Sequence, residues 1–338
     1  MKMRENVPIS ELTTMKMGGA TRFVLDIEDA ESVQNAYRFA TDRGLPVYVI
    51  GGGSNIIGRD EGFDGVILKN NIKGFEPVSE TADELLLRVG SGEVLDDVVA
   101  YTVSRGWCGM EALAAIPGTI GGAVMQNAGA YGQEMSDVLV SVLAYDIAAG
   151  VLTTIEVEHL DLSYRRSIFN TTARGRYFIV SATVRLHPCE IRGELYWSLQ
   201  SYLDEQGICD RHPGSICKAV SDIRAKKLPD PEVQASSGSF FKNISVAEED
   251  IDALREQFPG IPIYQIGGCW EIASGWLIEQ VGYKGRLLFG MRVSDKAALI
   301  LINESAHSYA DLAAARAEIV AAVEDAFGFT LEQEPEEI

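Results

Sequence analysis

The fold is decided by the segment Pro46-Val47-Tyr48-Val49-Ile50-Gly51-Gly52-Gly53-Ser54-Asn55, in which an apolar, strand-forming run enters a glycine turn directly. Before it, residues 22–27 are predicted to form a strand, and Asp29 is predicted to cap a helix with Val33 and Ala36 on its apolar face. This β-α-β order indicates an α/β lobe. Three glycines allow backbone N–H groups to approach an anion closely, although an ordinary tight turn explains an isolated triplet equally well.

A second glycine-rich stretch covers residues 116–132. It reads Ile-Pro-Gly-Thr-Ile-Gly-Gly-Ala at 116–123 and Gln-Asn-Ala-Gly-Ala-Tyr-Gly at 126–132. Such a density of glycine is unusual for a connecting loop. Two glycine turns, one from each of two lobes, can converge on a single pyrophosphate, so we expect the two stretches to meet.

The rest of the chain predicts two further regions. From about residue 73 short alternating strands surround one helix near 94–105, and a polar segment at 188–214 has the character of an insertion. Residues 215–330 have their own helices. One is predicted to begin at a capping box, Ser245 to Glu248, and another buries Leu312, Ile319 and Val323. Residues 331–338 are a short acidic tail.

Composition excludes several classes of function. The net charge of −20, from 29 basic and 49 acidic residues, argues against nucleic-acid or anionic-membrane partners, which require a basic surface. Five cysteines without a Cys-x-x-Cys pair and four isolated histidines indicate neither a disulfide framework nor a metal site. Without a leader or an apolar run of membrane-spanning length, we expect a cytoplasmic protein.

Five further motifs, taken with the glycine turns, resemble the UDP-N-acetylenolpyruvoylglucosamine reductase family. They are, in chain order, Tyr164-Arg165-Arg166-Ser167-Ile168-Phe169, Lys227-Leu228-Pro229, Gly238-Ser239-Phe240-Phe241-Lys242-Asn243, Ala273-Ser274-Gly275-Trp276-Leu277 with Lys284-Gly285, and Leu331-Glu332-Gln333-Glu334. The resemblance spans residues 20–334.

The family resemblance implies an α+β fold in which a two-lobed FAD-binding domain of the vanillyl-alcohol-oxidase type precedes an α+β substrate-binding domain. Its expected boundaries are 1–72 for the first lobe, 73–214 for the second with a tyrosine-bearing insertion at about 188–214, 215–330 for the substrate domain, and 331–338 for a tail that returns to the active site.

The resemblance also implies non-covalent FAD and, as co-substrate, NADPH. The expected cofactor-binding residues are Gly51, Gly52, Gly53, Ser54, Asn55, Gly118, Thr119, Gly121, Gly122, Asn127 and Gly129. Hydride from flavin N5 would add to the vinyl carbon of UDP-N-acetylglucosamine enolpyruvate, giving UDP-N-acetylmuramate for peptidoglycan. Arg165 and Glu334 would stabilise the charge that develops on the carboxylate, and Ser239 would donate the proton.

An acidic protein needs a local basic surface to bind a nucleotide diphosphate, and the resemblance implies that Tyr131, Tyr196, Lys227, Asn243 and Lys284 contact the substrate. Arg224, Lys226 and Lys242 are further candidate cations. Tyr196 is equally well explained as a core aromatic beside Trp197. We expect a monomer.

Three positions depart from the family pattern: Asn170, where lysine is frequent, Ala297, and Pro335, where an aliphatic residue is usual. Proline cannot donate to a sheet, so we expect the final strand to be lost or shortened and Glu334 to be weakly held. Two alternatives stay open: an oxidase of the same flavin fold with covalent flavin, and a non-catalytic flavin- or nucleotide-sugar-binding protein. Retention of Arg165, Ser239 and Glu334 together argues against the second.

Overall fold

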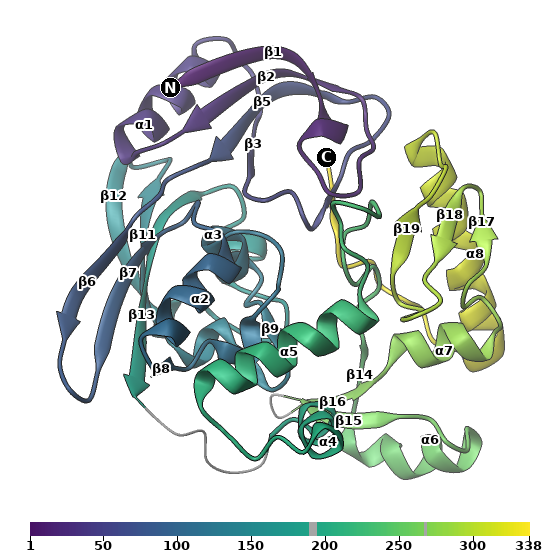
Figure 1. The fold of residues 1–338 in the computed structure, drawn as a ribbon. Helices are drawn as coiled ribbons and strands as arrows, with labels where there is room; N and C mark the ends of the chain where they lie inside the picture. The colour runs from purple at the N-terminus through teal and green to yellow at the C-terminus, as the bar shows by residue number, and fades with distance from the viewer. Residues whose placement is uncertain (189–194, 267–268) are drawn as a thin grey trace. The chain divides into compact units, whose positions relative to one another are not determined.

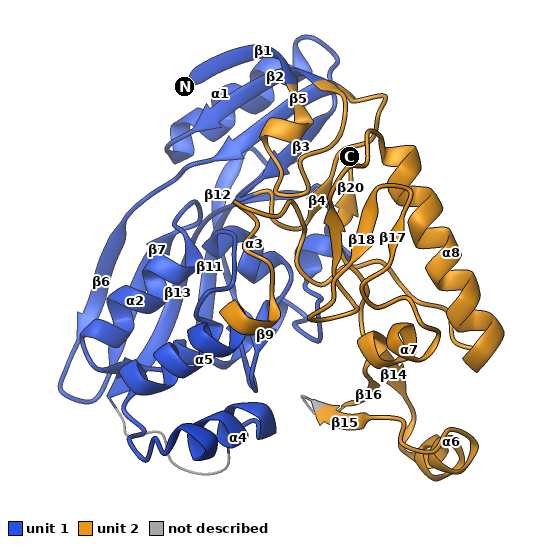
Figure 2. Ribbon diagram, turned by 45° about the vertical axis from the view of Figure 1, so that its right-hand side comes forward, with its two compact units in different colours: residues 1–7, 21–52, 64–224 blue, residues 8–20, 53–63, 225–338 orange. Residues whose placement is uncertain are grey.

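The computed structural model describes residues 1–188, 195–266 and 269–338 (Figure 1). The chain forms two compact units (Figure 2). Unit 1 contains residues 1–7, 21–52 and 64–224, and unit 2 contains residues 8–20, 53–63 and 225–338. Short 3-10 helices occur at Ile9–Glu11, Glu111–Leu113, Met135–Asp137, Val157–His159, Ile168–Asn170 and Glu248–Asp250.

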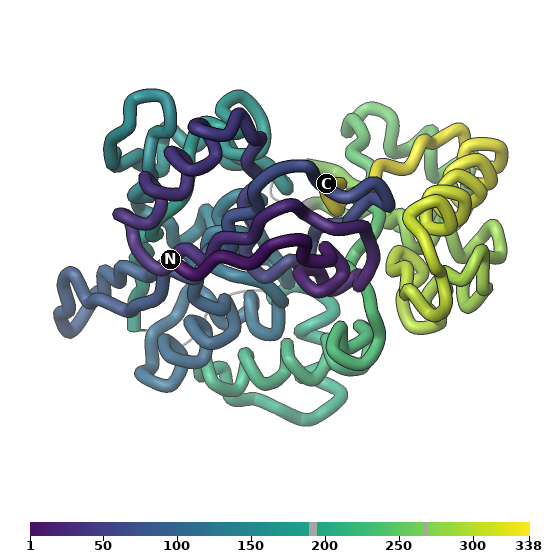
Figure 3. The backbone as a smooth tube through the Cα atoms, turned by 90° about the horizontal axis from the view of Figure 1, so that it is seen from above, coloured from purple at the N-terminus to yellow at the C-terminus, as the bar shows by residue number. Residues whose placement is uncertain are grey.

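The first sheet of unit 1 has the strand order β1-β2-β5-β3. Its strands are β1 (Lys2–Pro8), β2 (Ala20–Ile27), β3 (Val47–Ile50) and β5 (Phe63–Asn70), and β3 runs parallel to β5. β1 and β2 lie side by side in two views (Figure 1 and Figure 3). Helix α1 (Ala30–Thr41) is capped by Asp29, which accepts from the Ser32 amide at 2.7 Å. The predicted strand–helix–strand order is confirmed.

The second sheet of unit 1 is antiparallel and has the order β12-β11-β13-β7-β6, with β8 paired to β13. The strands are β6 (Phe75–Glu80), β7 (Leu85–Gly90), β8 (Trp107–Cys108), β11 (Leu139–Asp146), β12 (Val151–Glu156) and β13 (Tyr177–Pro188). The sheet shares one core with the helices α2 (Leu95–Ser104), α3 (Ile120–Met125), α4 (Trp197–Gln206) and α5 (Pro213–Lys227). A small hairpin joins β9 (Gly129–Ala130) to β10 (Gln133–Glu134).

Unit 2 is built around helix α8 (Tyr309–Phe327), whose face with Leu312, Ile319 and Val323 is buried as predicted. Two small antiparallel sheets have the orders β14-β16-β15 and β17-β18-β19. Their strands are β14 (Ile244–Val246), β15 (Ile263–Ile266), β16 (Cys269–Ile272), β17 (Leu287–Leu288), β18 (Met291–Val293) and β19 (Leu301–Asn303). The remaining elements are α6 (Ile251–Gln257), α7 (Ser274–Gln280) and the parallel pair β4 (Ile56–Ile57) and β20 (Glu336–Glu337).

Three features differ from the sequence expectations. The capping box predicted from Ser245 is wrong, because Ser245 pairs with Glu271 inside a sheet. Among the long helices of the described residues, α8 begins at a capping box, in which the Ser308 side chain accepts from the Asp311 amide. Cys108 is disulfide-bonded, which the odd cysteine count did not indicate.

The compact units also divide the chain differently from the expected boundaries. Helix α5 buries Ile216 and Val220 in the core of unit 1, so the main segment of unit 2 begins at Ala225 rather than at 215. Residues 8–20 and 53–63 join unit 2, where Met15 and Ile57 are core residues. Domain boundaries predicted as continuous segments could not place these two short segments in the same unit as residues 225–338. Residues 189–194 of the expected insertion lie outside the described part of the chain. None of the helices in the described ranges has the length and apolar character needed to cross a bilayer.

Candidate active site

The two glycine turns meet within unit 1. A Cβ on Gly52 would lie 2.8 Å from the Gly118 Cα, and a Cβ on Gly51 would lie 2.4 Å from the Thr119 Oγ1. The first of these contacts is with backbone, which cannot move aside, so only glycine fits at Gly52. The predicted convergence of the two stretches is therefore confirmed.

The second turn is held by backbone hydrogen bonds to residues 91–95. The amides of Ile120 and Gly121 donate to the carbonyls of Glu93 and Ser91 at 2.9 and 2.8 Å, and the Leu95 amide donates to the Gly118 carbonyl at 3.1 Å. The Gly121 amide is therefore already used inside the protein and does not serve as a donor to a ligand. Gly121 is needed for close packing, since a Cβ there would lie 3.1 Å from Ser91.

Two polar groups at the meeting turns suit an anionic ligand. The Thr119 Oγ1 is buried and has no hydrogen-bond partner among the described residues. Buried hydroxyls without a partner are rare in proteins, and a missing ligand is one explanation. The Lys69 ammonium donates to the Gly51 carbonyl, and burial lowers the pKa of Lys69. Glycine backbone, a free hydroxyl and an adjacent ammonium fit a pyrophosphate group.

Lys69 was missed by sequence reasoning. It lies one residue before the end of a buried strand and belongs to no motif, and its role depends on β5 lying beside β3.

Asn127 and Gly129 brace the loop after the second turn. The Asn127 amide nitrogen donates to Glu134 at 2.8 Å and to the Ser163 carbonyl at 3.2 Å, and its oxygen accepts from the Ser136 amide at 2.9 Å. Its side chain thus uses both donors and one acceptor internally. A Cβ on Gly129 would lie 2.7 Å from the Gln133 carbonyl across the hairpin. A cofactor contact by either residue stays a prediction.

Arg165 lies at the tip of a two-residue turn. The backbones of Ser163 and Arg166 exchange hydrogen bonds of 3.1 and 3.0 Å, and Arg165 takes a φ of +55°. Such a conformation is strained for a residue with a side chain, and strain of this kind often marks functional positions. The Asn170 side chain donates to the Arg165 carbonyl at 3.0 Å and accepts from the Ser167 amide at 2.9 Å. Asn170, one of the positions that departs from the family pattern, therefore helps to close the turn.

Two tyrosines and Arg224 lie near one another within unit 1, and Arg224 also lies near Arg165. The rings of Tyr131 and Tyr196 meet edge to face, with centroids 6.0 Å apart. Arg224 is half-buried, its Nε donates to the Ala115 carbonyl at 3.2 Å, and no carboxylate in the described ranges forms an ion pair with it. Burial lowers the pKa of Arg224, while Tyr131 and the Asp96 carboxylate raise it and Arg165 lowers it. A desolvated guanidinium beside a second arginine favours an anionic ligand.

Ser239 and Glu334 are brought together in unit 2. Phe240 follows Ser239 and is fully buried; its amide donates to the Leu299 carbonyl at 2.8 Å, and its carbonyl accepts from the Glu334 amide at 2.9 Å. Ser239 and Glu334 are themselves half-buried. Gly238, with a φ of +72°, provides the turn before the serine. The two predicted catalytic residues of this unit therefore flank one shared backbone contact.

The predicted substrate-binding residues of unit 2 differ in how they are held. The Asn243 side chain donates to the buried Glu271 at 3.1 Å and accepts from the Ser274 amide at 3.3 Å, which leaves one donor and one acceptor position for a ligand. Lys284 is exposed and ion-paired with Glu279 at 2.9 Å. Lys227 is exposed at the end of α5.

The rest of the first glycine motif belongs to unit 2. A Cβ on Gly53 would overlap the Leu12 carbonyl oxygen, at 2.0 Å, and Gly53 has a φ of +72°. The Asn55 Nδ2 is buried without a hydrogen-bond partner in the described part of the chain. Ser54 is half-buried beside it.

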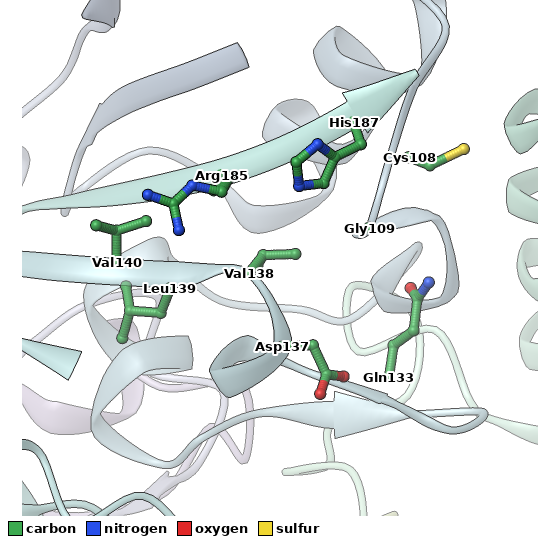
Figure 4. Close-up of a pocket in the computed structure, with 9 residues that line it drawn as sticks. All are labelled: Cys108, Gly109, Gln133, Asp137, Val138, Leu139, Val140, Arg185 and His187. Carbon is green, nitrogen blue, oxygen red and sulfur yellow. The ribbon is translucent and has the colours of Figure 1, made fainter. Parts of the chain in front are cut away.

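A separate pocket in unit 1, of about 320 Å³, contains none of the predicted site residues. Figure 4 shows Arg185 and His187 on β13, with Gln133 and Asp137 across from them. Arg185 pairs with Glu84 at 3.1 Å, and the Gln133 amide donates to a glutamate. These groups are already satisfied by the protein, so the pocket is not the site that the motifs define.

Comparison with known proteins identifies the chain in two steps. Residues 21–156 match the family model described as an FAD binding domain, and residues 230–338 match that of the UDP-N-acetylenolpyruvoylglucosamine reductase C-terminal domain. With the glycine turns, the first match defines a flavin-dependent oxidoreductase whose cofactor is FAD. The predicted fold class is confirmed.

Relatives over the full length define the family. The UDP-N-acetylenolpyruvoylglucosamine reductase of Burkholderia lata is 38% identical and covers 97% of this chain and 95% of the relative. That of Pseudomonas putida is 34% identical, covering 99% and 98%. The crystal structure of the Thermus caldophilus enzyme has a TM-score of 0.65 at 24% identity and covers 99% of each chain. The chain belongs to the UDP-N-acetylenolpyruvoylglucosamine reductase family, which places it in peptidoglycan precursor synthesis.

Proposed function

We propose that the protein reduces UDP-N-acetylglucosamine enolpyruvate to UDP-N-acetylmuramate, with NADPH as the electron donor. The observation that carries this proposal is that the Glu334 amide donates to the carbonyl of Phe240, the residue after Ser239, on motifs that retain the family's serine and glutamate. When bound, non-covalent FAD reduced by NADPH would supply the hydride that adds to the terminal vinyl carbon.

FAD would be held at its pyrophosphate by the meeting glycine turns. Gly51, Gly52 and Gly118 allow close approach of the backbone, and the Thr119 hydroxyl offers a hydrogen bond. Lys69 keeps the Gly51 carbonyl turned toward itself and adds a positive charge at the turn. Gly53, Ser54, Asn55, Gly121, Gly122, Asn127 and Gly129 complete the proposed cofactor-binding set.

Charge develops on the substrate carboxylate when the vinyl carbon gains a hydride. The Arg165 guanidinium, fixed by its turn, would stabilise that charge without reorganisation, and Glu334 would share a proton with the carboxylate. Ser239 would then donate a proton to the carbon that bears the ether oxygen. Serine is a weak acid, so its contribution depends on placement beside the substrate carbon and on a route for proton replacement.

The uridine diphosphate is the anionic half of the substrate. Lys227, Lys284 and the free donor of Asn243 are proposed to bind it, with Tyr131 and Tyr196 against the sugar or diphosphate. Arg224 joins this set because its half-buried guanidinium has no carboxylate partner among the described residues. Phosphate binding by such groups is charge-assisted, which offsets the cost of burying them. We propose that the protein acts in the cytoplasm, because its nucleotide substrates are charged. We also propose that it is a monomer, which sedimentation would test.

The experiment that tests the function follows the two half-reactions separately. The purified flavoprotein is mixed anaerobically with NADPH, and the loss of flavin absorbance is recorded. The enolpyruvyl substrate is then added. Recovery of the absorbance together with formation of UDP-N-acetylmuramate is expected; reduced flavin that persists in the presence of substrate would refute the proposal. Acid precipitation should release all the flavin if it is bound non-covalently.

A further inference from the structure

Residues 331–338 form an ordered tail in unit 2. Leu331 is buried, the Glu332 carbonyl accepts from the Lys242 amide at 2.9 Å, and the Glu334 amide donates to the Phe240 carbonyl at 2.9 Å. Beyond Pro335 the chain forms β20, which runs parallel to β4 (Figure 2). We expected Pro335 to leave the final strand lost or shortened; the strand is present but only two residues long, and it begins directly after the proline.

The backbone alone holds the end of this tail weakly. Pro335 has no amide to donate, so the ladder resumes only at Glu336, which donates to the Asn55 carbonyl at 3.0 Å. The Ile338 amide donates to the Ile57 carbonyl at 3.0 Å, and its carbonyl accepts from the Arg59 amide at 2.7 Å. A two-residue strand with three such bonds has little stability of its own.

Side chains supply the missing attachment. We name Arg59, Arg316, Gln333 and Glu337 the tail clamp. Arg59 donates to the Glu337 Oε2 through Nε at 3.0 Å and Nη2 at 2.5 Å, and the Arg316 Nη1 donates to the Oε1 at 2.6 Å. The same Arg316 nitrogen donates to the Gln333 Oε1, and the Gln333 amide donates to the Pro335 carbonyl at 2.7 Å.

The surroundings of the clamp make it stronger than a surface ion pair. The Glu337 side chain is only 16% exposed, against 53% for Arg59. Burial raises the pKa of Glu337, but hydrogen bonds from Arg59, Tyr309 and Arg316 outweigh it and lower the pKa to about 2. Partly buried carboxylates held by two guanidinium groups are less screened by solvent than exposed pairs.

We propose that the tail clamp sets the position of Glu334, so that Arg59, Arg316 and Glu337 are positioning residues for the proposed reaction. This inference rests on the proposed function. Glu334 lies three residues before Glu337, a span of at most roughly 10 Å of extended chain. Pro335 fixes φ within that span, so a displacement of β20 is transmitted to Glu334 rather than absorbed. Gln333 braces the same segment from the other side of the proline.

The test compares Glu337→Ala and Glu337→Gln with the matched variant Asp325→Asn. Asp325 is an exposed acid on α8, the helix that carries Arg316, and it lies outside the clamp. Flavin reduction by NADPH and flavin reoxidation by the enolpyruvyl substrate are measured anaerobically. Glu337→Ala is expected to slow reoxidation at least tenfold, mainly in the maximal rate, and to leave reduction and FAD content unchanged. Glu337→Gln keeps one acceptor and should be intermediate, while Asp325→Asn should match the wild type.

Hydrogen exchange provides a readout that does not depend on catalysis. The amides of Glu334 and Glu336 should be protected in the wild type and exchange faster in Glu337→Ala, while amides inside α8 keep their protection. Unchanged tail protection, or equal slowing of both half-reactions, would overturn the proposal. A wild-type protein that does not turn over the substrate would instead refute the proposed function, and the exchange result would still decide whether the clamp holds the tail.

Discussion

Arg165 lies in a turn that is closed by residues 163–170, whereas Glu334 lies in a tail whose attachments come from residues as distant as Arg59, 278 positions from Glu337. Both residues are proposed to stabilise the charge that develops on the same substrate carboxylate. The turn is closed by backbone bonds and one asparagine, and the tail by a partly buried cluster of charges.

This difference predicts which substitutions should disturb Arg165 and which should disturb Glu334. A local turn keeps its shape as long as its own residues are intact. A tail held at its end can detach by local opening while the rest of the unit stays folded, because the free energy of local opening is smaller than that of global unfolding. Substitutions far from Glu334 in the sequence should therefore affect it, whereas Arg165 should respond mainly to substitutions in its own turn and in residues 127–129, which contact Ser163 and the Arg165 guanidinium.

The largest effect is expected at Ser239, which precedes the residue whose carbonyl holds the tail, Phe240. Ser239→Ala should slow flavin reoxidation by substrate about 10² to 10⁴-fold, since a general acid contributes that much, and leave flavin reduction by NADPH nearly intact. Stopped-flow absorbance measures both rates. Equal losses in the two half-reactions would show that Ser239 has a structural role.

Glu334→Gln and Glu332→Gln compare two neighbouring acids of the tail. Glu334→Gln should lower the rate of the substrate half-reaction by roughly 10²-fold, because a group that stabilises transition-state charge is lost. Glu332 is 75% exposed in its contact with Lys242, and its variant should retain most activity. An inactive Glu332→Gln with an active Glu334→Gln would mean that the motif is aligned two residues out of place.

The next prediction concerns the glycine turn that follows β3, which is held by a side chain from the neighbouring strand β5. Lys69→Met removes the ammonium that holds the Gly51 carbonyl and should weaken FAD binding about tenfold, as expected for loss of one charged hydrogen bond. Lys73→Met is the control, since Lys73 is exposed and paired with Glu93 at 3.4 Å. Flavin titration followed by fluorescence gives both dissociation constants. Equal affinities would exclude Lys69 from the site.

Asn170 tests the local turn. Asn170→Ala should lower the free energy of unfolding by about 1 kcal/mol, the usual value of a capping side chain, and reduce kcat/KM through a less well-held Arg165. Thr172→Ala, at an exposed position two residues on, should change neither. Denaturant unfolding and steady-state kinetics provide the readouts. Full kcat/KM in Asn170→Ala would show that the turn does not depend on Asn170.

The smallest effect is expected from pH. The pKa of Glu337 is lowered from 4.5 to about 2, so its stabilising contribution is present above the unfolded value and is lost as the pH falls through the folded one. Protection of the Glu336 amide should stay constant between about pH 8 and 5 and decline only below about 4.5. The bonds described above that close the Arg165 turn, among residues 163–170, involve backbone groups and the Asn170 amide, so the turn should show no such decline. Loss of tail protection already near pH 6 would contradict the assigned clamp.

The elements and motifs were largely predictable from the sequence because they depend on local order. The strand before Gly51, the cap at Asp29 and the buried face of α8 follow from periodicity and turn chemistry, and all three are present. The predicted capping box at Ser245 failed because pairing with β16 overrode a local helix signal. The convergence of the glycine turns was expected from composition, and the close approach of Gly52 to Gly118 shows why glycine is required there.

By itself, the sequence determined which residues are available for chemistry: two glycine turns, an arginine in a short loop, a serine motif and a terminal glutamate. Only the tertiary structure decided how they are held. Lys69 reaches Gly51 because β5 lies beside β3, and Glu337 meets Arg59 and Arg316 because β20 adds to β4. These contacts depend on pairing between segments far apart in the chain, and charged side chains without a periodic pattern leave no local signal of their partners.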